Sequence, residues 1–179
     1  GLPDLLVGER SGTVKYFENI NFNGKAITVA SLFIQDNTEL HIENTIIDGS
    51  KPTHPDSASV VSFFNGEDTT SILMGFTIQG GGGTLVQYEL FGGGIICRYS
   101  GPKIIHNKII NNLLMNEAGA MSGGGISATY TTPQTIIIRD NHIIGNLCLQ
   151  EQGFLATGGG ISFAYNSNGI VENNSILEN

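Results

Sequence analysis

The sequence predicts an all-β chain that folds as a right-handed parallel β-helix, a solenoid of about six coils. Three observations support this prediction: the composition, two short strings that recur in a fixed order, and strand-like columns that align with those strings. Of the 179 residues, 25 are glycine and only 13% are charged, whereas soluble domains ordinarily carry about 25% charged residues. A chain rich in glycine, asparagine and isoleucine favours short strands joined by tight turns.

The repeat is clearest in the C-terminal half. The string Gly-Gly-Gly-Ile ends at Ile95, Ile126 and Ile161, and the string Asn-x-Ile-(Ile/Leu)-x-Asn spans 107–112, 141–146 and 174–179. Weaker copies of the second string begin at Asn19, Asn44 and Gly75, so successive copies start 25 to 34 residues apart. A repeat of this length is typical of solenoids.

Aligning the strings places three strand columns two residues apart. Because side chains alternate between faces along a strand, these columns share one face, which their apolar content assigns to the interior. We expect the last column to stack inside the coils as an aromatic ladder. The columns are Val29, Val60, Ile95, Ile126, Ile161; Ser31, Ser62, Cys97, Ala128, Phe163; and Phe33, Phe64, Tyr99, Tyr130, Tyr165. The asparagines that begin the second string should form another ladder, bonded between coils.

The Gly-Gly-Gly-Ile strings, the asparagine column and the aromatic column together resemble the right-handed parallel β-helix, or pectin-lyase-like, superfamily. The resemblance covers nearly the whole chain. It implies a polysaccharide ligand in a groove along one sheet, and in the family's enzymes a lyase or hydrolase activity. We expect residues 1–179 to form a single β-helix domain within a longer protein, with 1–18 as an irregular first coil or partial cap. Uncapped solenoid ends expose backbone and core, which suggests further domains or end-to-end self-association.

Charge and hydropathy exclude two classes of partner. The net charge is −8, and no basic run exists that could neutralise nucleic-acid phosphates. No apolar stretch reaches the 18 or so residues of a membrane span. Cys97 and Cys148 are expected to stay unbonded, because one is interior and the other opens an excursion more than one coil away.

Candidate catalytic residues lie beside the asparagine column. His106 should sit one coil from Asp140, and Lys108 one coil from His142. A histidine beside a carboxylate can act as a general base, but a solvated polar face with weak pairs explains the same residues. The outward columns of the aromatic strand contain Arg98 and no carboxylate. Glycosidases need two carboxyl groups, so no catalytic residue carries over from the family.

Three apolar excursions, 80–91, 113–122 and 147–157, each precede a Gly-Gly-Gly string. We expect them to stack as one wall that covers Val61, Phe63 and Ile96 on the outer face of the aromatic strand. The alternative is the rim of a binding groove. In that case Glu89, Glu117 and Glu151 would form an acidic row able to hold Ca²⁺.

The leading functional hypothesis is an extracellular or cell-surface β-helix module of a larger secreted or bacterial surface protein. Its role would be binding, adhesion or structure, directed at a polysaccharide or cell-surface ligand, with Arg98, Lys108 and His142 among the binding residues. The alternative is a polysaccharide lyase or glycoside hydrolase, whole or as a fragment, with His106 and Asp140 as catalytic residues or with its chemistry at the wall formed by the excursions.

Overall fold

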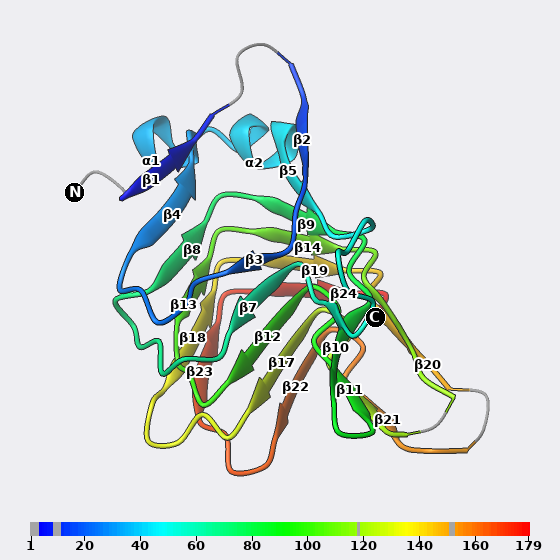
Figure 1. The fold of residues 1–179 in the computed structure, drawn as a ribbon. Helices are drawn as coiled ribbons and strands as arrows, with labels where there is room; N and C mark the ends of the chain where they lie inside the picture. Colours follow the sequence, from blue (N-terminus) through cyan, green and yellow to red (C-terminus); the bar gives the residue numbers. More distant parts are fainter. Residues whose placement is uncertain (1–3, 9–11, 118, 151–152) are drawn as a thin grey trace.

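A computed structural model describes residues 4–8, 12–117, 119–150 and 153–179 as a parallel β-solenoid of about five turns (Figure 1). Each turn adds one strand to each of three parallel sheets, called A, B and C in the order in which the chain visits them. Sheet A consists of β1 (Leu5–Val7), β4 (Thr28–Ser31), β8 (Ile72–Met74), β13 (Lys103–Ile105), β18 (Ile136–Arg139) and β23 (Gly169–Glu172). Sheet B consists of β2 (Val14–Phe17), β5 (Thr45–Asp48), β9 (Thr77–Gln79), β14 (Lys108–Ile110), β19 (His142–Ile144) and β24 (Ser175–Leu177). Sheet C consists of β3 (Ile20–Asn21), β7 (Val61–Phe63), β12 (Ile95–Arg98), β17 (Ile126–Thr129) and β22 (Ile161–Ala164).

The segments between sheets B and C form two further sheets at the side of the coils (Figure 1). Sheet D consists of β6 (Ser57–Ala58), β10 (Gly83–Val86), β11 (Glu89–Phe91), β16 (Met121–Ser122) and β21 (Ala156–Thr157), with β10 and β11 as an antiparallel hairpin. Sheet E pairs β15 (Leu113–Met115) with β20 (Leu147–Leu149). Two short helices, α1 (Phe33–Asp36) and α2 (Leu40–Asn44), lie between β4 and β5. No helix among the described residues is long and apolar enough to cross a membrane.

The coil count of six is slightly too high: sheets A and B have six strands each, but sheet C has five. The first copy of the repeat was also placed wrongly. Asn19 does not begin a strand of sheet B. It precedes β3 in sheet C, where Ile20 pairs with Val61 and the Asn19 side-chain amide donates to the Ser59 carbonyl. The first strand of sheet B is instead β2, which pairs with β5.

The first two predicted interior columns have the correct register in the last three turns and are shifted by one residue upstream. Ile95, Cys97, Ile126 and Ala128 are fully buried. Their partners in β7 are Val61 and Phe63, rather than the expected Val60 and Ser62. Val61 and Phe63 therefore belong to the solenoid core and not to its outer face. Val29 is also buried, but in sheet A.

The aromatic ladder exists, but on the outside. Tyr99, Tyr130 and Tyr165 each follow the last residue of a sheet C strand and adopt a left-handed backbone, with φ of 56°, 52° and 53°. In a continuing strand, each tyrosine side chain would point into the interior, opposite to the residue before it. The left-handed backbone ends this alternation, so the tyrosine ring points outward instead. The rings stack with centroids 5.3 and 5.1 Å apart. The two other predicted members do not join them, since Phe33 lies in α1 and Phe64 follows β7 one residue out of register.

The asparagine ladder is confirmed for Asn107, Asn141 and Asn174 but not for Asn19 and Asn44, and a second ladder accompanies it. The amide of Asn141 donates to the Asn174 side-chain oxygen at 2.9 Å, and its own oxygen accepts from the backbone N–H of Asn107. The asparagines that end the same string repeat the pattern, because the Asn146 amide donates to the Asn179 side chain and accepts from Asn112. Both ladders tie successive turns together through buried amides.

The excursions cover part of sheet C and leave part of themselves exposed. Ile96 and Ser127 on the outer face are fully buried, as the covering prediction required. Leu90, Leu114 and Met121 form a second small core with Cys148 packed against it. The remaining large apolar side chains stay partly in solvent: Leu85, Tyr88, Leu113, Met115, Leu147, Leu149, Phe154 and Leu155. Cys97 and Cys148 are unbonded, as expected.

Candidate functional site

A groove of about 250 Å³ lies between the β10–β11 hairpin and the tyrosine side of sheet C. It brings together Arg98 and Glu89, two of the residues predicted to bind a ligand. Its eight lining residues are Val86, Gln87, Tyr88, Glu89, Phe91, Arg98, Tyr130 and Tyr165. The hairpin supplies the first five of these, and successive turns of the solenoid supply the other three.

The tyrosine ladder forms one side of the groove. Tyr99 and Tyr165 are 51% and 45% exposed, although their rings are stacked on Tyr130. The Arg98 guanidinium lies 4.9 Å from the ring centroids of both Tyr99 and Tyr130, and it donates to the Tyr99 hydroxyl at 3.3 Å. These contacts hold the one cation of the groove against aromatic rings.

Glu89 joins the hairpin to the ladder. The Tyr165 hydroxyl lies 2.8 and 2.6 Å from the two carboxylate oxygens of Glu89, to which it donates. Phe91, beside Glu89 on the hairpin, meets the Tyr165 ring edge-on with centroids 6.3 Å apart. The hydrogen bond to Glu89 raises the pKa of the Tyr165 phenol, and the loss of solvent and the negative charge of Glu89 add to the effect.

The tyrosines hold this place against a backbone preference. A bulky residue with positive φ is uncommon, because it costs on the order of 1–3 kcal/mol and persists only where its surroundings enforce it. Glycine or asparagine would meet the turn geometry with less strain. Three successive turns nevertheless carry tyrosine, and two of the three rings are about half exposed. Strained residues of this kind gather at functional sites.

A second cluster contains the four residues predicted beside the asparagine column. His106, Asp140, Lys108 and His142 line a small pocket of about 70 Å³ with residues of α1 and α2. The His106 imidazole lies 3.8 Å from the Asp140 carboxylate, and Lys108 lies opposite His142 in the strand pairing. Helix residues complete the pocket: Phe33, Glu39, Ile42 and Glu43.

The backbone explains why His106 and Asp140 occupy their positions. Each has a positive φ, 52° and 55°, at the corner that turns the chain from sheet A into sheet B. The corresponding residues in the neighbouring turns, Gly75 and Asn173, have the same conformation. Glycine, asparagine, aspartate and histidine are the residue types most tolerant of it. The column therefore follows from turn geometry, and Lys108 forms an ion pair with Glu43 at 3.4 Å.

The structure does not bring the glutamates of the predicted acidic row together at one site, as far as it describes them. Glu89 lies in the tyrosine groove, whereas Glu117 lines a different pocket with Met115, Asn116 and Leu149. Glu151 lies outside the described residues. Within the described part of the chain, no three histidine, cysteine, aspartate or glutamate side chains converge in a way that could hold a metal ion. The Ca²⁺ row stays a prediction.

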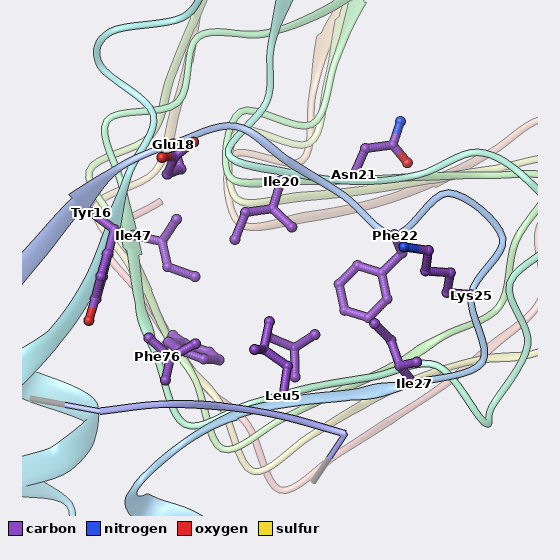
Figure 2. Close-up of a pocket in the computed structure, with 12 residues that line it drawn as sticks. Leu5, Tyr16, Glu18, Ile20, Asn21, Phe22, Lys25, Ile27, Ile47 and Phe76 are labelled. Atoms are coloured by element: carbon purple, nitrogen blue, oxygen red, sulfur yellow. The ribbon is translucent and has the colours of Figure 1, made fainter.

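A larger cavity of about 330 Å³ lies at the first turn, where β1, β2 and β3 begin the three sheets. Figure 2 shows apolar side chains converging on it: Leu5, Ile20, Phe22, Ile27, Ile47 and Phe76. Phe22, Ile47 and Phe76 are members of the main core. This cavity is therefore the N-terminal end of the core and offers few polar groups to orient a ligand.

Sequence reasoning missed Tyr130, Tyr165 and Phe91 as site residues, because two of them were assigned to the interior. A signal was present. Turn-forming residues follow each tyrosine at once: Ser-Gly-Pro at 100–102, Thr-Thr-Pro at 131–133 and Asn-Ser-Asn-Gly at 166–169. Such residues mark the end of a strand, so the tyrosines belong to corners, where the alternation of strand faces no longer applies.

Comparison with protein-family models, with curated proteins and with solved structures found no match for this chain.

Proposed function

We propose that this chain is a carbohydrate-binding β-helix module of a secreted or cell-surface protein, and that the tyrosine groove is its binding site. The observation that carries the proposal is the exposed ladder of Tyr99, Tyr130 and Tyr165, kept at corners whose backbone disfavours tyrosine. Core packing does not account for rings that are half in solvent. A requirement for exposed aromatic surface does account for them.

The groove suits a sugar chain in three respects. A pyranose ring has an apolar C–H face that packs against aromatic surface, which the exposed parts of the stacked Tyr130 and Tyr165 rings supply. Its hydroxyl rim needs donors and acceptors, which Arg98 and Glu89 supply. The ladder also runs from turn to turn along the solenoid, so the same contact can repeat along an extended polymer.

Binding is favoured over cleavage by the number of carboxyl groups. Glycoside hydrolysis uses a pair of carboxyl groups on either side of the scissile bond. Among the eight lining residues only Glu89 is acidic. The lyase or hydrolase alternative would depend on His106 and Asp140, whose pocket of about 70 Å³ is too small for a sugar chain.

The test is binding to a panel of soluble polysaccharides by affinity electrophoresis and calorimetry. We expect Tyr130→Gly to weaken binding about tenfold, which corresponds to roughly 1.4 kcal/mol. Phe154→Ala is the matched control, because Phe154 is a 48% exposed aromatic outside the groove, and it should bind as the wild type does. Equal binding by wild type and Tyr130→Gly would refute the site. Release of unsaturated or reducing ends by the pure protein would establish the enzyme alternative.

A further inference from the structure

We infer that the groove selects neutral, hydroxyl-rich glycans over acidic ones, and that Glu89 is the residue that makes the selection. The inference rests on the proposed function and goes further by naming the chemical class of the ligand. It is built on the charges that line the groove, on what Arg98 and Glu89 contact, and on the charge of the whole chain.

The groove has no net positive charge to attract an anion. Its two charged residues are Arg98 and Glu89, so their formal charges cancel. Arg98 is held over two tyrosine rings and donates to the Tyr99 hydroxyl, so its charge is already in contact with aromatic and phenolic groups. A ligand anion entering here would approach the Glu89 carboxylate at the same time, and like charges in a confined site repel.

The whole chain adds to this preference. The sequence has 16 acidic and 8 basic residues, for a net charge of −8. A protein with this imbalance repels polyanions at long range and slows their association. A neutral polymer is not affected by either the long-range or the local repulsion.

Glu89 itself distinguishes donors from acceptors. An ionised carboxylate can only accept hydrogen bonds, so it pairs with hydroxyl groups and rejects groups that have no proton to give. The Tyr165 phenol demonstrates the fit, since one hydroxyl lies within hydrogen-bond distance of both carboxylate oxygens. A sugar can supply two neighbouring hydroxyls to the same two oxygens, and these charge-assisted bonds are stronger than neutral ones.

The decisive experiment uses one oligosaccharide in two forms. An oligogalacturonate carries a carboxylate at C6, and reduction of that group to a hydroxyl gives a neutral chain with the same length and linkage. Calorimetry with the wild type should show the neutral form binding at least about tenfold more tightly, both with and without added Ca²⁺. A broader set of neutral oligosaccharides should be included, because the linkage is not specified by the groove.

Variants of Glu89 and Tyr165 separate charge from shape. Glu89→Gln keeps the side-chain size but adds an N–H donor, so it should weaken binding of the neutral form and improve binding of the acidic form, which narrows the ratio between them about tenfold. Tyr165→Phe leaves Glu89 charged, so the preference for the neutral form should remain even if affinity changes. Phe154→Ala should leave both affinities as in the wild type.

The outcomes distinguish the two proposals. Tighter binding of the acidic form that still depends on Tyr130 would overturn the selectivity inference and leave the proposed function in place. A neutral preference that survives Glu89→Gln unchanged would overturn the role of Glu89. Failure of every neutral and acidic glycan to bind the wild type would refute the proposed function itself.

Discussion

Two corners of the later turns share a left-handed backbone conformation but differ in the side chains that they carry. Between sheets A and B, the left-handed positions are filled by Gly75, His106, Asp140 and Asn173, all types that this conformation accepts. Between sheets C and A, they are filled in the last three turns by Tyr99, Tyr130 and Tyr165. The first corner is followed by a buried asparagine ladder, and the second presents an exposed aromatic ladder.

The difference teaches how to read such a corner. Where residue type agrees with the backbone, the fold alone explains the sequence, and the pairing of His106 with Asp140 needs no catalytic role. Where residue type disagrees with the backbone in turn after turn, the proposed function supplies the reason, since it requires aromatic side chains that face solvent. Four measurements test these structural assignments, and they are given in order of decreasing expected effect.

The largest effect is expected at the asparagine corner. In Asn141→Ala, the backbone N–H of Asn107 and the carbonyls of Ile104 and Arg139 lose buried partners. Each stranded group costs roughly 1–3 kcal/mol, so we expect a loss of about 3–4 kcal/mol in the free energy of unfolding. Urea denaturation measures it. His142→Ala, an exposed neighbour, is the control, and a loss below about 1 kcal/mol in Asn141→Ala would show that the ladder does not hold the turns together.

A smaller, pH-dependent effect is expected at Asp48, at the end of β5. Burial would raise the pKa of this carboxyl, but hydrogen bonds from Ser50 and Gln79 and the ion pair with Lys15 outweigh it and hold the pKa well below its ordinary value. The stabilisation is complete above the unfolded pKa of about 3.9 and is lost as the pH falls below it. Asp48→Asn should therefore be less stable than the wild type by about 1–2 kcal/mol at pH 7. Thermal unfolding should show the gap narrowing below about pH 4, and a gap that stays constant down to pH 2 would contradict the assignment.

A still smaller effect is expected at the tyrosine corner. Tyr130→Gly loses two ring contacts, worth roughly 0.5–1.5 kcal/mol each, but it also removes a left-handed backbone strain of about 1–2 kcal/mol. The net change in unfolding free energy should stay below about 1 kcal/mol by urea denaturation. A loss of about 3–5 kcal/mol, the usual cost of deleting a core aromatic, would instead mean that the ring is inside the solenoid.

The smallest effect is a shift in one titration. Because the phenol of Tyr165 donates to Glu89, its pKa is raised, and the hydrogen bond is intact below the ordinary tyrosine pKa of about 10 and lost as the pH rises through the raised value. Ultraviolet titration of Glu89→Gln should show one tyrosine ionising at lower pH than in the wild type. Glu117→Gln, which changes a carboxylate outside the groove, should reproduce the wild-type curve. Identical curves for Glu89→Gln and the wild type would contradict the hydrogen bond between Tyr165 and Glu89.

The repeat made most of the fold predictable. Two strings of defined order placed Ile95, Ile126 and Cys97 in the core and Asn107, Asn141 and Asn174 in a ladder, because each position was supported by several copies. The pairs His106 with Asp140 and Lys108 with His142 followed from the same alignment.

The errors arose where that support was missing. Upstream of Gly75 the copies are degenerate, and α1 and α2 interrupt the turn, so Asn19 and Phe33 were assigned to columns to which they do not belong. The tyrosine error has a different cause. Alternation was extended one residue beyond the strand, and a single left-handed residue reverses the face of everything that follows. The groove itself depends on the β10–β11 hairpin crossing to Tyr165, a contact 76 residues apart that no local pattern encodes.

The Gly-Gly-Gly strings restrict which sequence changes this architecture can accept. A methyl group on Gly94 would lie 2.7 Å from the carbonyl oxygen of Gly125, and one on Gly124 would lie 2.6 Å from that of Gly159. Each turn is thus shaped by the backbone of the next, and single replacements in this stack are excluded one by one. Duplication of a whole turn meets no such barrier, since it adds glycine opposite glycine and tyrosine beside tyrosine. A further turn of this kind would therefore lengthen the aromatic ladder by one ring.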